Sequence, residues 1–238
     1  MQIFVDAFRE GWAALTSGGI IDVWTIVITS LRVSVFAVMV ALVIGIPVGL
    51  VVGTKRFIGW RAALIIFNSG MGLPPVVVGL LVAMTLSRRG PLGFLDLLYS
   101  QNAIVIAQVI ISVPIVMAIT AASVASVPRE LRLQARSLGA SSMRVSLLTL
   151  SEARMGLLAA VAGGFGAIIS EVGAATMVGG NIAGQTRVMT TAMVQYTRMG
   201  RYGYALSLAI VLMTIVIGVN VIITSMQTSA EKWEAEGR

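Results

Sequence analysis

Side chains that carry out covalent chemistry are scarce in this chain of 238 residues. It has no cysteine and no histidine, which excludes thiolate catalysis, imidazole acid–base catalysis and the usual zinc sites. Its only lysines, Lys55 and Lys232, do not follow a glycine, so the nucleotide-binding sequence GxxxxGK[ST] is missing. We therefore expect no catalytic residue, no metal site and no cofactor in this chain, and any energy from ATP must come from a partner.

Positive charge gathers instead in one short stretch. Four arginines lie within residues 129–144, between two long apolar runs. Good helix formers follow Pro128, which suits the first position of a helix, and Gly139 lies where a turn is expected before a second helix. The pattern predicts a helix, a glycine turn and a helix within a loop of residues 125–155. On this pattern alone, a projecting binding segment and a plain connector are equally good interpretations.

The elements that must position these side chains are membrane spans. Hydrophobic residues make up 57% of the chain and charged residues 11%, whereas soluble domains have about 25% charged residues. Uncharged apolar runs of about 20 residues are long enough to cross a bilayer as helices. The chain is therefore expected to be an all-α membrane protein, and its runs predict five transmembrane helices, over residues 24–52, 60–86, 103–124, 157–178 and 204–226.

The two ends of the chain differ from this membrane domain. In residues 1–22, aromatic side chains recur at helical spacing opposite charged ones, which predicts an amphipathic helix lying in the membrane interface. Residues 23–228 are expected to form the transmembrane domain, with a loop over residues 180–201. Residues 229–238 are expected to form a polar cytoplasmic tail.

Basic residues are more frequent in the loops on one side of the membrane, the side of Lys55, Arg129 and Lys232. Because positively charged loops stay in the cytoplasm, we expect a multi-pass protein of the cytoplasmic (inner) membrane, with its N-terminus outside and its C-terminus inside. The same bias accounts for the net charge of +7 without any nucleic-acid partner.

The second span is interrupted by the sequence NSGMGLPP, residues 68–75. Glycine and proline break the hydrogen-bond ladder of a helix, which predicts two half-helices or one strong kink. Broken helices of this kind line the pathways of transporters, and a packing kink without a ligand is an equally good interpretation.

The sequence QARSLGASSMRVSLLTL, residues 134–150, resembles the cytoplasmic loop of permease subunits of ATP-binding cassette importers, whose consensus reads EAA followed by R-T-L-G-A-S. Ser137 stands for the family threonine, and Leu133 and Gln134 replace the acidic residue and the first alanine. The resemblance implies that this segment is a coupling helix that docks on an ATPase subunit. The residues expected to couple are Arg132, Gln134, Ala135, Arg136, Ser137, Leu138, Gly139, Ala140 and Ser141.

Two further stretches resemble the molybdate, tungstate and sulfate permeases: LPPVVVGLLVAMTLSRRGPLG and SEVGAATMVGGNIAGQTRVMTTAM. The latter stretch is most similar to tungstate permease subunits. The resemblance implies a type I importer permease fold and a homodimer in the lipid bilayer. It also implies two ATPase subunits that bind ATP and Mg²⁺, and an extracytoplasmic oxyanion-binding protein. The expected substrate is tungstate, with molybdate or sulfate as the alternative.

Polar side chains near the outer membrane face are candidates for the substrate pathway of such a permease. Asn181, Thr186 and Thr190 offer neutral donors for a tetrahedral oxyanion, and a solvated loop that touches the binding protein is the alternative. For Glu171 we favour a structural or gating hydrogen bond over substrate contact, because a carboxylate repels a dianion. The residues expected in the pathway or its gate are Asn68, Ser69, Gly72, Pro74, Glu171, Asn181, Thr186 and Thr190.

A stand-alone secondary carrier is the competing class. It would need coupling groups in the middle of the membrane, where ionisable residues are usually functional. Apart from Arg32 and Glu171, both near the outer ends of their spans, the predicted spans hold no such group in mid-membrane. The residues therefore favour an ATP-driven importer.

Overall fold

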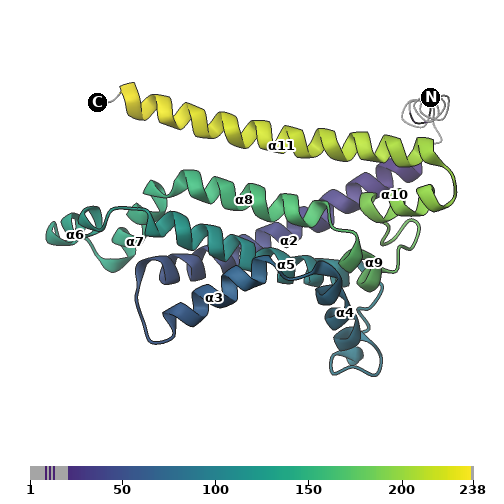
Figure 1. The fold of residues 1–238 in the computed structure, drawn as a ribbon, viewed down its shortest axis with the longest axis horizontal. Helices are drawn as coiled ribbons and strands as arrows, with labels where there is room; N and C mark the ends of the chain where they lie inside the picture. Colours follow the sequence, from purple (N-terminus) through teal and green to yellow (C-terminus); the bar gives the residue numbers. More distant parts are fainter. Residues whose placement is uncertain (1–8, 10, 12, 14–20, 237–238) are drawn as a thin grey trace. The chain divides into compact units, whose positions relative to one another are not determined.

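The computed structural model describes residues 21–236 together with Arg9, Gly11 and Ala13. All regular structure in the described residues is helical (Figure 1). The α-helices are α2 (Ile21–Thr54), α3 (Trp60–Met71), α4 (Pro75–Leu86), α5 (Gln101–Ala125), α6 (Arg129–Ser137), α7 (Ser142–Glu152), α8 (Arg154–Ile169), α9 (Gly173–Gly179), α10 (Met189–Arg198) and α11 (Tyr202–Glu236), and a 3₁₀ turn, η1, spans Gly93–Leu95.

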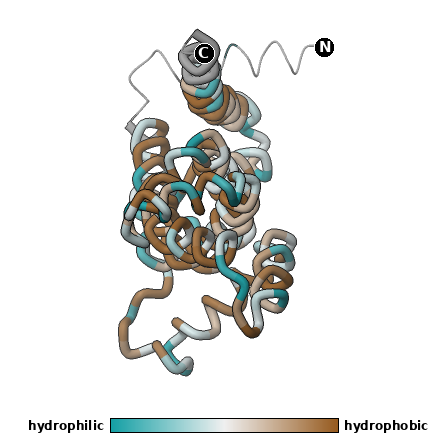
Figure 2. The backbone as a smooth tube through the Cα atoms, turned by 90° about the vertical axis from the view of Figure 1, so that its left-hand side faces the viewer, coloured by the Kyte–Doolittle hydropathy of each residue, from teal (hydrophilic) through white to brown (hydrophobic). Residues whose placement is uncertain are grey.

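Three of these helices, α2, α5 and α11, are long and apolar enough to cross a membrane. Two pairs of shorter helices, α3 with α4 and α7 with α8, pass the same test when each pair is taken as one broken span. The described residues therefore hold three to five spans, and the predicted five is the upper value. Hydrophobic residues prevail along most of the helices (Figure 2), and large apolar side chains such as Val43 on α2 are exposed, as expected where lipid surrounds the protein.

The predicted fourth span, residues 157–178, is wrong in its extent. Helix α8 ends at Ile169, and the chain turns before it restarts as α9. At this turn the Ser170 hydroxyl donates to Gly166 O at 2.8 Å, so it takes up a carbonyl of the last helical turn. The apolar sequence therefore continues past the end of the helix, interrupted by Glu171.

The predicted amphipathic helix of residues 1–22 lies largely outside the described residues. At the other end, α11 continues to Glu236, so the backbone of the predicted tail is helical as far as that residue.

The described chain forms two compact units, and each is assembled from separate stretches of sequence. The first unit comprises residues up to 37, 74–110 and 166–219, and the second comprises 38–73, 111–165 and 220–238. The boundaries fall inside α2, α5, α8 and α11, so each of these helices contributes residues to both units.

In the first unit, buried polar side chains join elements that are distant in sequence. Gln108 on α5 donates through Nε2 to Ser34 Oγ of α2 at 3.4 Å and to Ile168 O of α8 at 3.2 Å. The backbone N–H of Met189 donates to Ser30 Oγ at 2.7 Å. Such bonds matter because a buried polar group without a partner costs stability.

In the second unit, α2 and α5 pack closely through a stripe of small residues. Gly45, Gly49 and Gly53 recur every fourth residue, and a Cβ on Gly53 would lie only 2.6 Å from Ala121 O. Glycine at this spacing lets two helix backbones approach each other in a membrane. Two buried clusters extend this core: Ala41, Val116 and Ala160 join it to α8, and Val124, Val127 and Ala153 join the end of α5 to the turn between α7 and α8.

Candidate functional site

The segment that resembles a coupling helix has the predicted shape of helix, glycine turn and helix. Pro128 occupies the cap before α6, one residue earlier than expected. After α6, Gly139 N donates to Arg136 O at 2.9 Å and Ala140 N donates to Ala135 O at 3.0 Å. With Gly139 at φ +82°, this pair of bonds is a Schellman motif, which satisfies the last carbonyls of the helix.

Helix α7 anchors this turn to the second unit. Ser141 Oγ caps the helix by accepting from Arg144 N at 3.4 Å. One face of α7 is buried through Val145 and Thr149, and the Thr149 hydroxyl donates to Val145 O at 2.7 Å. In contrast, none of the residues of α6 is fully buried. The second helix therefore holds the first one out from the core.

The end of α6 exposes apolar side chains in a basic segment. Leu138, in the turn, is 88% exposed, and Leu133 and Met143 on either side of it are also exposed. Apolar side chains that gather on a polar surface mark a protein contact. The nine residues expected to couple lie on α6 and in the turn that follows, and Arg132, Ala135 and Ala140 are the partly buried ones.

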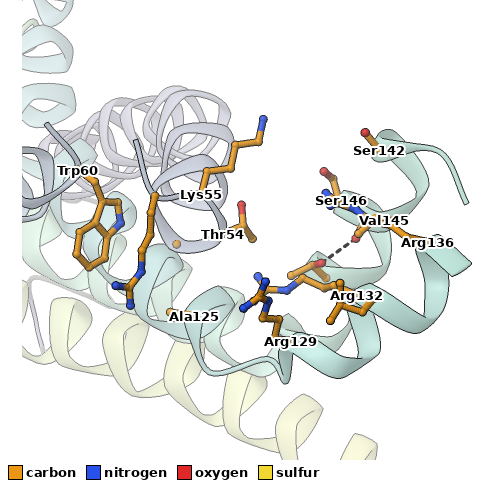
Figure 3. Close-up of a pocket in the computed structure, with 14 residues that line it drawn as sticks. Thr54, Lys55, Trp60, Ala125, Arg129, Arg132, Arg136, Ser142, Val145 and Ser146 are labelled. Carbon is orange, nitrogen blue, oxygen red and sulfur yellow. Dashed lines mark hydrogen bonds between the residues drawn. The ribbon is translucent and has the colours of Figure 1, made fainter. Parts of the chain in front are cut away.

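A pocket of about 850 Å³ lies in the second unit between the end of α2, α6 and α7 (Figure 3). Lys55 and Arg56, which follow α2, line it together with Arg129, Arg132 and Arg136 from α6. From the sequence alone, Lys55 and Arg56 are interpreted only as basic residues of the cytoplasmic side, not as part of a site. Their place on the same membrane side as α6 was the signal that could have grouped them.

In the first unit, Glu171 makes a structural hydrogen bond. Its Oε1 accepts from Ala174 N at 3.0 Å and so caps the first turn of α9. Its backbone carbonyl accepts from the Thr190 hydroxyl at 2.7 Å, which ties α10 to the end of α8. A gating role for Glu171 stays a prediction.

The threonines expected in the pathway are buried: Thr186 is 2% exposed and Thr190 is 3% exposed. The Thr186 hydroxyl donates to Gly179 O at 2.5 Å and accepts from Ile182 N at 2.9 Å. Beside it, Asn181 accepts from Arg187 Nε through Oδ1 at 3.2 Å. These groups hold the loop together, so contact with an oxyanion, which stays a prediction, requires their bonds to open.

The prediction of a loop over residues 180–201 is wrong, because α10 lies within it. Met189, Ala192 and Tyr196 are buried at spacings of three and four residues, so one face of this helix is apolar. The intervening threonines and glutamine hid that face in the sequence.

The break predicted in the second span is present, since α3 ends at Met71 and α4 begins at Pro75. Gly72 N donates to Ser69 O at 3.1 Å, which closes the last turn of α3. Asn68, Ser69, Gly72 and Pro74 are exposed. Their exposure agrees with a pathway as well as with lipid contact, so the pathway role stays a prediction.

Comparison with known proteins identifies this arrangement of helices and loop. Residues 45–232 match the family model of the binding-protein-dependent transport system inner membrane component. The chain belongs to this family. It is 38% identical to the probable anion ABC transporter permease protein of Haloferax volcanii, over 82% of this chain and 87% of that protein. It is 37% identical to the tungstate uptake system permease protein TupB of Peptoclostridium acidaminophilum, over 95% and 99%.

A solved structure supports the fold. The inward-facing methionine ABC transporter MetNI matches with a TM-score of 0.68 and 18% identity, over 87% of this chain and 94% of that one. The predicted all-α fold of a type I importer permease is therefore confirmed. Family membership also confirms the prediction of a multi-pass membrane permease subunit that has no ATPase site of its own.

Proposed function

We propose that this chain is the permease subunit of an ATP-driven importer that moves tungstate across the cytoplasmic membrane. Tungstate is assigned as the substrate because of the 37% identity to the tungstate uptake permease of Peptoclostridium acidaminophilum. This similarity extends over nearly the whole of both chains. A second tungstate permease, from Campylobacter jejuni, is 35% identical, whereas the molybdenum permease of Escherichia coli is 30% identical. Tungstate is therefore favoured, and molybdate is the second candidate.

The coupling segment supports the second part of the proposal, that two ATPase subunits bind and hydrolyse ATP with Mg²⁺ for this chain. The Schellman turn holds Leu138 away from the core, where an apolar side chain in a cleft of a partner is removed from water. Because α7 is anchored by buried residues, a movement imposed on α6 passes to the end of the membrane core. Two such chains are expected to form the homodimer, with the N-termini outside and the C-termini inside.

The charge of the spans supports a division of labour with an external binding protein. The membrane segments of α5 and α11, residues 101–125 and 202–228, contain no charged residue, and the charged residues of α2 are Asp22 and Arg32, both in its N-terminal half. A fixed cation deep in a pathway of low dielectric would hold a dianion strongly, whereas passage requires binding weak enough for release. We therefore assign selectivity to the binding protein and passage to this chain.

Transport by the purified complex in proteoliposomes tests this function. We expect uptake of tungstate that requires the loaded binding protein outside and ATP on the side of the coupling segment, and that molybdate inhibits less than unlabelled tungstate does. Uptake that follows a proton or sodium gradient without ATP would instead make the chain a secondary carrier. Preferred uptake of sulfate would refute the assigned substrate while leaving the family unchanged.

Matched variants test the docking surface. Leu138→Asp is expected to prevent co-purification of the ATPase subunit, because a carboxylate is costly to bury in an apolar contact. Ile58→Asp changes an apolar residue that is even more exposed and lies outside the coupling segment, and it should leave the complex intact. Equal losses in the two variants would contradict the docking role of Leu138.

A further inference from the structure

The pocket beneath α6 has an unusual concentration of one charge. Five cationic side chains line it, from Lys55 and Arg56 after α2 and from Arg129, Arg132 and Arg136 on α6, and no lining residue is acidic. Like charges at such close quarters repel each other. A cluster of this kind, with no acidic residue in its lining, attracts an anion from elsewhere.

The positions of these side chains favour a bound anion over a merely basic surface. Figure 3 shows the side chains of Arg129 and Arg132 next to each other, reaching from α6 toward the end of α2. Nη1 of Arg132 is buried and has no hydrogen-bond partner among the described residues. A buried donor of a charged group that lacks an acceptor is costly, and an oxygen of an anion would satisfy it.

The wall of the pocket that faces α6, formed by Arg56 and Trp60, is fixed in position. The Arg56 guanidinium lies over the ring of Trp60, 5.1 Å from its centre, and Trp60 Nε1 donates to Val52 O at 2.7 Å. Trp60 itself is thus tied to the last turns of α2. The cation on this side is held in place by its stacking contact before any ligand arrives.

Neutral donors complete the lining. Ser142 and Ser146 lie one turn apart on α7 and line the same pocket as the arginines. Guanidinium groups bind tetrahedral oxyanions with two parallel hydrogen bonds, and hydroxyls can bond the remaining oxygens. The donor set is therefore that of a phosphate or tungstate site.

We propose that this pocket binds a tetrahedral dianion, which bridges the end of α2 to α6. Two sources share this chemistry: a soluble oxyanion, including the proposed cargo after its release, and the phosphate of an anionic phospholipid. The pocket goes beyond the proposed function, because its occupancy fixes the coupling segment to the membrane core and does not depend on transport. Occupancy therefore stabilises the arrangement of α6 that presents Leu138.

Binding to the purified full-length chain tests this site without any transport step. The midpoint of thermal unfolding is measured in detergent against sodium tungstate and against inorganic phosphate, with sodium chloride holding the ionic strength constant. In parallel, native mass spectrometry counts phosphatidic acid retained from nanodiscs of phosphatidylcholine that contain it. The pocket variant is Lys55→Gln/Arg129→Gln, and the control is Arg61→Gln/Arg144→Gln, which removes the same charge from two exposed positions outside the pocket.

The expected result is saturable stabilisation by an oxyanion, or retention of phosphatidic acid, in the wild type and the control. In the pocket variant the affinity should fall about tenfold or more, as loss of charge-assisted hydrogen bonds predicts. Without ligand, the pocket variant should unfold at a higher temperature than the wild type, because charge repulsion is relieved. A response to tungstate or phosphate identifies a soluble ligand, and a response to phosphatidic acid alone identifies a lipid.

Three results would overturn the proposal: no saturable response to any of the three probes, an equal loss in the pocket variant and the control, or loss of the ATPase subunit from the pocket variant without any anion binding to the wild type. The last would assign the cations to an acidic surface of the ATPase. Because none of these measurements uses transport, a failure of tungstate uptake would refute the proposed function and leave this site unaffected.

Discussion

Replacing Gly139 with valine should separate ATP hydrolysis from transport. Gly139 has φ +82°, and a Cβ at this position would meet no atom within 4 Å, so the substitution strains the backbone without a clash. A left-handed conformation costs an L residue about 1–2 kcal/mol, and a β-branched residue is a further outlier there. This free energy reduces the population of the intact turn by roughly 5- to 30-fold. When the turn opens, the Schellman bonds from Gly139 N and Ala140 N are lost and Leu138 is displaced.

The assay is the stimulation of ATPase activity by the loaded binding protein, measured with uptake in the same proteoliposomes. We expect Gly139→Val to lose most of the stimulation while basal ATPase activity remains. Gly139→Asn should retain most of it, because asparagine tolerates the left-handed region. Gly200→Val is the matched control, since Gly200 has φ +72° with equally open surroundings in the other unit. Normal coupling in Gly139→Val, or an equal loss in Gly200→Val, would refute the reasoning.

Three other predictions follow from the described bonds and exposures. Thr186→Val removes the hydroxyl that bonds two backbone groups of its loop, so the free energy of unfolding should fall by about 2 kcal/mol. Thr186→Ser keeps the hydroxyl and should unfold like the wild type. An unchanged melting temperature in the valine variant would contradict the structural role. Glu171→Ala removes the cap of α9 and should lower the free energy of unfolding by about 1 kcal/mol. Glu171→Gln keeps an acceptor oxygen and should transport normally. A Gln variant that folds but does not transport would show that the charge of Glu171 controls the gate. The chain has no native cysteine, and Phe94 and Ile58 are both exposed, so a single cysteine at either position can be labelled selectively. Phe94→Cys should react with an impermeant maleimide in intact spheroplasts, whereas Ile58→Cys should react only after the membrane is opened. The reverse pattern would invert the topology.

Features that depend on a few neighbouring residues could be predicted from the sequence. The coupling turn follows from a helix-forming stretch that ends at Gly139, and the break in the second span follows from the consecutive residues Pro74 and Pro75. In both places the deciding interaction is local: a left-handed φ that favours glycine, and a proline nitrogen that cannot donate. The family could likewise be recognised from short contiguous motifs in the sequence.

Features that depend on distant contacts were missed. The end of α8 at Ile169 lies in an apolar stretch of sequence in which only Ser170 and Glu171 mark a stop. The cationic pocket is lined by both Lys55 and Arg129, and neither stretch of sequence indicates that it lies near the other. Repulsion between like charges would have argued against that pairing. The close packing of α2 on α5 through Gly53 likewise becomes visible only when the partner helix is known.

The discontinuous make-up of the two units constrains the order in which a ribosome and an insertion machinery can build them. The first unit needs residues 166–219, so the early part of α2 enters the membrane long before its partners are synthesised. Ser30 illustrates how the nascent chain tolerates this delay: its hydroxyl donates to Ile26 O within α2 at 2.7 Å, a bond that one helix can make alone. Its oxygen then accepts from Met189 N, which arrives 159 residues later. Maturation is therefore a late, collective step, in contrast to the domain-by-domain folding of chains whose domains are contiguous.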